Sequence, residues 1–490
     1  MINPIPSQQA QDAALWPLVM HELRQLLRDG RFWGVAALVA VLLVTSGAFG
    51  LRHVNSMLSE RAEAQQTAAA QWTGQGDKNP HAAAHYGIYV FKPVGALSFL
   101  DPGVESSLGV TVKLQAHKRS SLEGAAAQDS TAIAQFGRLS PAAIIQLIVP
   151  LLIIGLGYTA WSAERERGTL RQIMSYGVRP RRLLLGKLVG LGGALVLLLA
   201  PAVLIGALGL VLLPGETGAL SASRAGAWVA VYGVYMVAYL LGAVWVSALS
   251  PSSRGALVIL LGFWGVTSLI VPRLAGDLID RTVPMPNPSA FAAQLKASME
   301  QGLPGSGGRE ARVDQLLGQL LEKEGFESDG GGMMMMQGAL MQGLELEAEA
   351  AFEREVIDHH FDRLATRSRT QELMLQSAGL CSPFIAVRAL SMGLAGTDLA
   401  HHQHFARHAE RYRRALVSQL NREFGEAAGS DGWAYKANRT LWEKAPPFTY
   451  APPSLGWSLE RQLIALAALL LWAMAAAVGA WSSMRRLKVS

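Results

Sequence analysis

The sequence predicts an all-α membrane protein with six transmembrane helices, an N-terminal interfacial helix and a mainly α-helical extracytoplasmic domain. Three observations predict this class. Half of the 490 residues are hydrophobic, which is a high fraction for a chain of soluble domains. Only 16% are charged, against about 25% in typical soluble proteins. Six apolar stretches also approach or exceed the length of about 20 residues that a helix needs to cross a bilayer.

The six apolar stretches divide the chain into spans and connections. The predicted spans are residues 32–50, 141–161, 183–213, 225–249, 255–271 and 461–482. The ends and connections are residues 1–31, 51–140, 162–182, 214–224, 250–254, 272–460 and 483–490. The connections 51–140 and 272–460 are long enough to form structure of their own outside the membrane.

Lysine and arginine residues near the span ends predict the orientation, because they accumulate on the cytoplasmic side of a membrane. They form four clusters: Arg24, Arg28 and Arg31; Arg165, Arg167, Arg171, Arg179, Arg181, Arg182 and Lys187; Arg254; and Arg485, Arg486 and Lys488. Six alternating spans bring all four clusters to the same side. We therefore expect both termini to be cytoplasmic.

The segment before the first span has an amphipathic pattern. Trp16, Val19, Leu23, Leu26 and Leu27 fall on one side of a helix, which predicts a helix lying in the membrane interface. The alternative is an early extension of the first span. We expect the first span to be retained rather than cleaved as a signal peptide, because the first residues of the chain lack a charged region and the apolar run is long.

The two long connections differ in their predicted structure. Residues 51–72 are rich in Ala, Gln and Glu and continue the first span as a helix, whereas Tyr86–Phe91 is strand-like. In 272–460, apolar residues recur at steps of three and four between proline-rich ends, which indicates long helices. The single cysteine, Cys381, excludes an internal disulfide, so this domain must be stabilised by its core alone.

No nucleotide-binding or catalytic motif is present in the sequence. In Gly186–Leu188 the lysine is not followed by Ser or Thr, and Arg181 stands where a phosphate-binding loop has its first glycine. The chain should therefore not hydrolyse ATP itself, and we expect no cofactor in it. The Cys381–Ser382 pair lies outside any nucleophile elbow, so we expect no catalytic residues and no enzymatic activity.

Three histidines have a spacing that could hold a metal ion. His401, His404 and His408 would share one face of a helix, and neutral imidazoles in such an array can bind zinc or copper. His359–His360 and Met333–Met336 could add ligands. No acidic or thiol ligand accompanies the set at metal-site spacing. We therefore interpret these residues as a polar helix face and a gap-filling methionine run, and expect no metal site.

The connection between the second and third spans carries a short charged run, Glu164-Arg165-Glu166-Arg167-Gly168-Thr169-Leu170. Charges at this density cannot lie in hydrocarbon. The run is compatible with a helix and lies between two apolar stretches, so it must present itself to something soluble on the cytoplasmic side.

This run, followed by Tyr176–Pro180 and Leu185–Lys187, resembles the cytoplasmic coupling region of ABC-2-type permeases. Other motifs resemble particular branches of that family. Tyr89–Pro93, Leu100–Gly103 and Gln115–His117 are similar to the branch that includes the permease of nitrous-oxide-reductase maturation. The motifs similar to a branch with a large extracytoplasmic insertion between the last two spans are Ser382–Pro383, Leu394–Asp398, His401–His402, Phe405 and Tyr412–Arg413.

The resemblance implies a permease subunit of an ABC exporter in the bacterial cytoplasmic (inner) membrane. It implies two copies of a separate ABC ATPase that binds ATP and Mg²⁺, a second permease that is the same chain or a homologue, and contact with membrane lipids. No nucleic acid partner is expected. The residues implied in ATPase coupling are Glu164, Arg165, Glu166 and Arg167 as charge partners, Gly168 and Thr169 in a turn, and Leu170 and Ile173 as apolar anchors.

Two other functions compete with export. ATPase-driven motion of the spans could move the extracytoplasmic domain against a periplasmic protein, without any substrate crossing the membrane. The size of that domain, inserted between the last two spans, keeps this mechanotransmission alternative open. A membrane-anchored metal-delivery protein that works without ATP is the third possibility, and it leaves the charged run unexplained.

Overall fold

The computed structural model describes residues 15–28, 30–105, 107–120, 139–176, 178–212, 218–325 and 338–485. Helices dominate these residues, and six are long and apolar enough to cross a membrane. The predicted all-α membrane fold with an additional helical region is confirmed. Several predicted features lie outside the described residues, among them Met333–Met336, Arg486 and Lys488.

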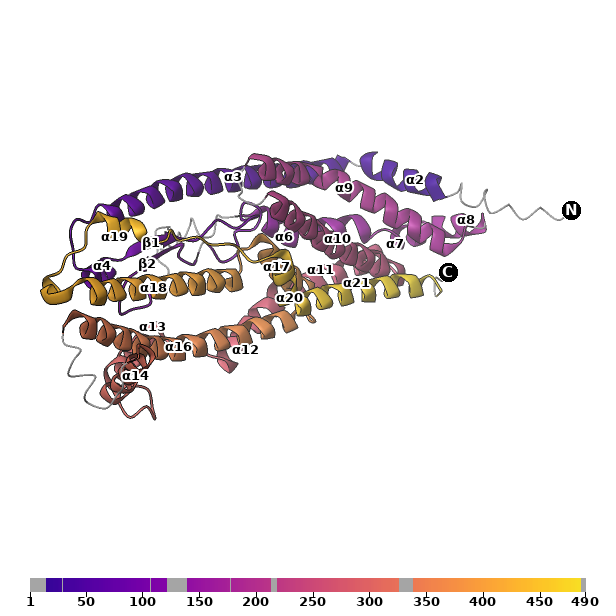
Figure 1. The fold of residues 1–490 in the computed structure, drawn as a ribbon. Helices are drawn as coiled ribbons and strands as arrows, with labels where there is room; N and C mark the ends of the chain where they lie inside the picture. Colours follow the sequence, from indigo (N-terminus) through magenta and orange to yellow (C-terminus); the bar gives the residue numbers. More distant parts are fainter. Residues whose placement is uncertain are drawn as a thin grey trace.

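The candidate spans form a bundle in one half of the molecule (Figure 1). They are α3 (Gly30–Thr73), α6 (Pro141–Gly157) followed by α7 (Ser162–Glu166), α9 (Pro180–Leu212), α10 (Gly218–Leu249), α11 (Ser253–Gly265) followed by α12 (Val271–Thr282), and α21 (Leu463–Ser483). A π-helical turn, η1 (Val266–Ile270), joins α11 to α12. Large apolar side chains such as Val196, Leu204 and Val211 are exposed on these helices, as lipid-facing residues are.

A separate N-terminal helix, α2 (Leu15–Arg28), packs along the first part of α9. Two glycines of α9 permit this close approach. A Cβ atom at Gly186 would lie 2.9 Å from the Cβ of Leu18, and one at Gly190 would lie 2.7 Å from the Cβ of Glu22. The amphipathic pattern predicted for this segment thus corresponds to a helix of its own, with Val19 buried and Trp16 exposed.

The remaining elements project from one end of the bundle and are called the projecting region (Figure 1). They are the second half of α3, α4 (Pro80–Tyr86), β1 (Ile88–Phe91), β2 (Thr111–Leu114), α13 (Pro288–Gln301), α14 (Arg309–Lys323), α16 (Ala339–Ala378), α18 (Leu399–Ala427), η2 (Gly429–Ala434) and α19 (Arg439–Lys444). The strand-like segment of the sequence is β1, which pairs antiparallel with β2 so that Ile88 faces Leu114. α17 (Pro383–Ala395) and α20 (Leu455–Arg461) lie at the junction with the bundle.

The hydrophobic core is divided between these two parts. One large cluster fills the bundle and extends into α17 through Leu390 and Leu394. A separate cluster joins the end of α3 to α18 and α19, where Trp72 packs edge-on against Trp442 with ring centroids 5.9 Å apart. The Trp72 indole also donates a hydrogen bond to the Trp442 carbonyl oxygen, at 2.9 Å. The long helix α3 is therefore anchored in both parts of the molecule.

Candidate functional site

The charged run of the sequence folds as two short helices, α7 and α8 (Thr169–Ser175), at the end of the bundle opposite the projecting region (Figure 1). Between them, Gly168 has φ of +72°, a left-handed conformation that side chains disfavour. The Thr169 hydroxyl donates to the Glu164 carbonyl oxygen at 3.2 Å. The predicted turn at Gly168 and Thr169 is therefore present, and we call residues 162–175 the α7–α8 segment.

Glu164 is paired within the chain. Lys187 of α9 donates to Glu164 at 2.5 Å and to Glu22 of α2 at 2.7 Å, so one ammonium group joins three helices. The Lys187 side chain is only 2% exposed. A cation this deeply buried requires hydrogen-bonded counter-charges, because its desolvation costs several kcal/mol. Glu164 is one of those counter-charges and is not free to pair with another protein.

Arg165 and Glu166 bind the facing ends of two spans. The Arg165 guanidinium donates to the carbonyl oxygens of Ala248, at 2.7 Å, and Ser250, at 2.5 Å, where α10 ends. The Glu166 carboxylate accepts hydrogen bonds from the backbone N–H and the hydroxyl of Ser253, at 2.8 and 2.9 Å, where α11 begins. Each charge thus complements the dipole of the helix end that it meets.

Hydroxyl groups reinforce the same attachment. The Ser247 hydroxyl of α10 accepts hydrogen bonds from the backbone N–H groups of Trp161 and Ser162, at 3.0 and 3.2 Å, and donates to the Tyr158 carbonyl oxygen at 2.8 Å. The Trp161 side chain is fully buried beside them. Together with the charged contacts, these bonds fix the α7–α8 segment to α2, α9, α10 and α11.

The predicted anchor Leu170 is not available to a partner, since its side chain is 2% exposed and lies in the bundle core. Ile173 is partly buried against the same core. The exposed residues of the segment are instead Glu166, Arg167, Gly168, Arg171, Gln172 and Ser175, and Tyr176 follows with 86% of its side chain exposed. Of the eight residues predicted for coupling, the side chains that face outward are those of Glu166 and Arg167, together with Gly168.

A buried polar network occupies the junction between bundle and projecting region. Arg224 of α10 is 2% exposed, and its guanidinium donates to the carbonyl oxygens of Leu394, at 3.0 Å, and Pro453, at 2.7 Å, and to the Ser458 hydroxyl at 3.0 Å. This single side chain therefore ties a span to the end of α17 and to the start of α20. Sequence reasoning missed this network, because the Leu394 and Ser458 partners of Arg224 lie 170 and 234 positions away.

A second chain of hydrogen bonds crosses the junction at Ser391 of α17. Its hydroxyl donates to the Asp101 carboxylate at 2.5 Å and accepts hydrogen bonds from Tyr232, at 2.9 Å, and from Trp228, at 3.0 Å. Gln146 of α6 donates to the Tyr232 hydroxyl at 2.7 Å. Burial raises the pKa of Asp101. Hydrogen bonds shielded from water thus connect α6 and α10 to α17 and to the loop at Asp101.

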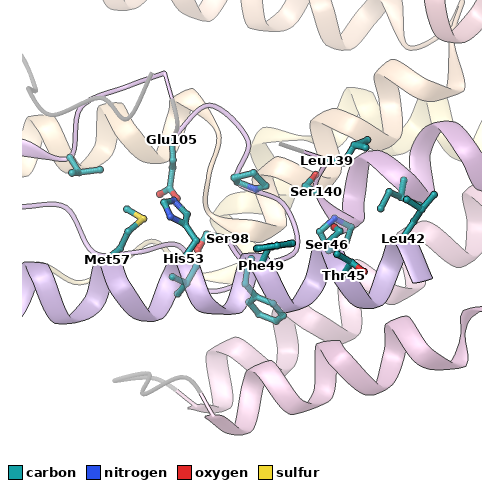
Figure 2. Close-up of a pocket in the computed structure, with 17 residues that line it drawn as sticks. Leu42, Thr45, Ser46, Phe49, His53, Met57, Ser98, Glu105, Leu139 and Ser140 are labelled. Carbon is teal, nitrogen blue, oxygen red and sulfur yellow. The ribbon is translucent and has the colours of Figure 1, made fainter. Parts of the chain in front are cut away.

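An apolar cavity of about 550 Å³ lies beside α3, near the same junction. Figure 2 shows Ser46 and Met57 of α3 on one wall, Ser98 and Glu105 of the β1–β2 connection on another, and Ser140 where α6 begins. Most of its lining surface is apolar, with a few polar groups. The cavity has the size and the mixed chemistry of a site for an amphipathic small molecule.

The comparisons with known proteins agree with this arrangement. A family model described as "ABC-2 family transporter protein" matches residues 16–315, which is more than half of the chain. The chain belongs to the ABC-2 transporter family. A second model, described as "Domain of unknown function (DUF3526)", matches residues 291–451, which include most of the projecting region's long helices. No curated protein matches the chain.

Membership of the ABC-2 family makes the chain a multi-pass transmembrane subunit of an ABC transporter, whose ATP hydrolysis belongs to an ABC ATPase partner. The resemblance seen in the sequence is confirmed at the level of the family, and its branch stays a prediction. The whole α7–α8 segment lies within the residues that the ABC-2 model matches.

The three histidines predicted to share a helix face in this ABC-2 chain do so on α18, but each has a different protein partner. His401 is hydrogen-bonded to Asp398 at 2.5 Å and to Ser458 at 3.1 Å. His404 is bonded to the Tyr450 hydroxyl and His408 to the Thr449 carbonyl oxygen, each at 2.9 Å. At least one ring nitrogen of each histidine is thus bonded within the chain, and His401 is buried rather than on an exposed polar face.

Three other histidines do converge in the described part of the ABC-2 chain: His81 and His85 of α4, and His117 after β2. Burial lowers the pKa of His81, and burial together with the neighbouring imidazoles lowers that of His85. A hydrogen bond to Glu353 raises the pKa of His117. Sequence reasoning missed this cluster, although the spacing of four residues between His81 and His85 was visible in it.

Proposed function

We propose that the chain is the permease subunit of an ABC exporter, and that the α7–α8 segment receives force from the ATPase on the cytoplasmic side. The attachment of this segment to four helices carries the proposal. A helix pair that an ATPase pushes can move the spans only if its own bonds to them are strong. The contacts of Glu164, Arg165 and Glu166 supply such bonds, so the charges serve inward attachment.

The surface offered to the ATPase is then basic and aromatic. Arg167 and Arg171 are exposed on the segment, Tyr176 follows them, and Arg254 is exposed at the start of α11. Tyrosine and arginine are the residue types that most often dominate binding energy at protein interfaces. Two such chains, or this chain and a homologue, would complete the transporter with two ATPase subunits, as the family resemblance implies.

Charge reversal on this surface tests the proposal. Arg167→Glu/Arg171→Glu leaves the inward contacts intact, and we expect it to reduce the ABC ATPase that copurifies from native membranes by at least about tenfold. The matched control is Lys296→Glu/Arg309→Glu, two exposed basic residues of the projecting region. Mass spectrometry identifies and quantifies the ATPase. Equal recovery of the ATPase with the variant and the control would overturn the proposal.

The cavity beside α3 supports an amphipathic cargo. Its walls come from a span and from the β1–β2 connection, so it lies where a molecule leaving the bilayer would reach the projecting region. Ser46→Trp fills the cavity from α3, whereas Ser59→Trp places the same bulk on an exposed position of the same helix. We expect mass spectrometry of the purified chain to find a bound amphiphile that is lost with Ser46→Trp and retained with Ser59→Trp.

The buried junction network supports the mechanotransmission alternative. Arg224 and Ser391 link the spans to α17 and α20 through buried hydrogen bonds. If this function is the correct one, ATP-driven motion works the projecting region against a periplasmic protein. Ser46→Trp would then leave the in vivo activity unchanged, and a soluble protein would copurify through the projecting region.

A further inference from the structure

Three histidine side chains meet at the far end of the projecting region. The Nε2 atom of His81 lies 3.1 Å from Nε2 of His85 and 3.4 Å from Nε2 of His117. One ring nitrogen from each residue lies within 4.8 Å of the others. Two of the residues are one helical turn apart on α4, and the third is brought to them by the turn after β2.

Hydrogen bonds on the far side of two rings assign their tautomers. Nδ1 of His117 is 2.7 Å from the Glu353 carboxylate, which only accepts, so this nitrogen carries the proton. Nδ1 of His81 is 3.1 Å from Oδ1 of Asn421. The Asn421 amide donates through Nδ2 to Glu347 at 3.1 Å, which fixes its oxygen toward His81. Nδ1 of His81 therefore carries a proton as well.

In their neutral forms, His81 and His117 consequently direct two Nε2 lone pairs at each other over 3.4 Å. A proton on either Nε2 atom would relieve this repulsion, but it would make that ring a cation because its Nδ1 is already protonated. A metal cation relieves it for all three rings at once. The supporting bonds to Glu353 and Asn421 are of the kind that orient metal-binding imidazoles in proteins.

The distances suit a metal ion of the size of Zn²⁺. Two nitrogens bound at 2.0–2.1 Å with a tetrahedral angle between them lie about 3.3 Å apart. The two separations measured from His81 are 3.1 and 3.4 Å. Three imidazoles in this arrangement leave the fourth position open, and the exposed side of the cluster, where His85 lies, gives access to it.

The backbone holds the three ligands in place before any ion binds. His117 has φ of +63° and is the only non-glycine residue with positive φ in the described part of the chain. Such a conformation costs about 1 kcal/mol or more and persists only where the surrounding structure holds it. The N–H of the preceding residue, Ala116, donates a hydrogen bond to the Ala84 carbonyl oxygen of α4 at 2.8 Å. The turn at His117 is thereby fixed against α4.

We propose that His81, His85 and His117 form a binding site for one divalent transition-metal ion that prefers imidazole ligands, Zn²⁺ or Cu²⁺, with Glu353 and Asn421 as positioning residues. The donor set contains three nitrogens and no thiolate, which favours these ions over Mg²⁺ or Ca²⁺. The site joins the first long connection to α16 and α18. It does not depend on whether the chain exports a substrate.

The test uses the full-length chain, without a histidine tag, stripped of metal with EDTA and held in detergent. Titration calorimetry with ZnCl₂ and with CuCl₂ should give one ion per chain. His85→Ala removes an exposed ligand, and His117→Asn removes a second while keeping a residue that tolerates positive φ. We expect the double variant to abolish stoichiometric binding, and Glu353→Gln to weaken it by about 10–100-fold.

The matched control is His404→Ala/His408→Ala, which removes two histidines of the α18 face and should leave the affinity unchanged. Electron paramagnetic resonance of the Cu²⁺-loaded chain reports the ligands directly, with three coordinating nitrogens expected in the wild type and two in His85→Ala. Absence of one-to-one binding by the wild type would overturn the proposal. So would binding that survives His85→Ala/His117→Asn or disappears in the α18 control.

Discussion

The α7–α8 segment and the histidine cluster lie at opposite ends of the molecule and use polar groups in opposite ways. In the α7–α8 segment, Glu164, Arg165 and Glu166 each bind groups of their own chain. In the cluster, the Nδ1 atoms of His81 and His117 are bonded to the protein, but the Nε2 atoms face one another. Charged residues that the sequence suggests for a protein interface can therefore stabilise their own chain instead. Histidines without a recognisable motif can be folded so that their Nε2 lone pairs face one another.

This difference decides what a substitution should do. Removing a polar group that the chain itself satisfies leaves its partners buried and unpaired, which costs stability. Removing one histidine from a cluster whose Nε2 atoms face one another should change the free energy of unfolding little and affect mainly the binding of a metal ion. We therefore expect four effects on stability, from a large loss where the chain itself satisfies a buried charge to a very small one in the histidine cluster.

The largest effect is expected from Lys187→Met. The substitution leaves the carboxylates of Glu22 and Glu164 close together without their cation, and breaking a buried pair in this way costs about 3–5 kcal/mol. Unfolding of the purified chain by SDS in mixed micelles measures the loss. Adding Glu22→Gln and Glu164→Gln to the same variant should recover part of it. A free energy of unfolding within about 1 kcal/mol of the wild type would contradict the structural role of this cation.

A smaller effect is expected from pH, through His402 of α18. Burial, assisted by the charge of Lys92, lowers the pKa of His402 to about 4 in the folded protein. The unfolded chain binds this proton near pH 6.5, so the folded state loses stability as the pH falls from about 6.5 toward 4. Above pH 7 this contribution is fully present. His402→Gln, which cannot titrate, should flatten the decline of the melting temperature between pH 7 and pH 5. Parallel curves for the wild type and the variant would refute the assignment.

Gly168→Ala should cost about 1 kcal/mol, because the added Cβ disfavours φ of +72° while meeting no other atom within 4 Å. Gly193→Ala in α9 is the control, since this glycine also has open space around it but is not among those with positive φ. The control should keep or raise the melting temperature. Similar behaviour of the two variants would show that the turn between α7 and α8 is not held in this conformation.

The smallest effect is expected from His85→Ala in the metal-free protein. His85 is exposed, and its Nε2 contact is to another histidine, so we expect a change in unfolding free energy of at most about 0.5 kcal/mol. The same SDS titration used for Lys187→Met measures it. A loss comparable to that of Lys187→Met would mean that the cluster is a structural hydrogen-bond network, and the contrast between the two regions would fail.

The sequence was sufficient for the features that depend on local pattern. Long apolar runs predicted the six membrane helices, and the strand-like segment Tyr86–Phe91 contains β1. A turn at Gly168 and Thr169 was also expected, and the structure shows that Gly168 adopts a left-handed conformation in it. Each of these features depends on residues that are neighbours in the chain, so it can be predicted without knowledge of the tertiary structure.

The partners of charged groups could not be predicted in the same way. Lys187 meets Glu22 from 165 positions away, and Arg224 meets Ser458 from 234 positions away. The resemblance implied that Leu170 is an anchor at a protein interface, but the core of the bundle covers it. The histidine cluster forms only because the turn at His117 brings this residue back against α4, and a contact between such distant residues is not visible in the sequence pattern.

The length of α3 has a mechanical consequence. Its 44 residues form one helix of about 66 Å, at 1.5 Å per residue, that runs from the bundle into the projecting region. A tilt of about 5° at its base would displace the far end by about 6 Å, the height of one helical turn. That end is fastened by Trp72 to Trp442, close to the histidine-bearing helix α4. A small change of tilt among the spans would therefore become a displacement of about one helical turn beside α4.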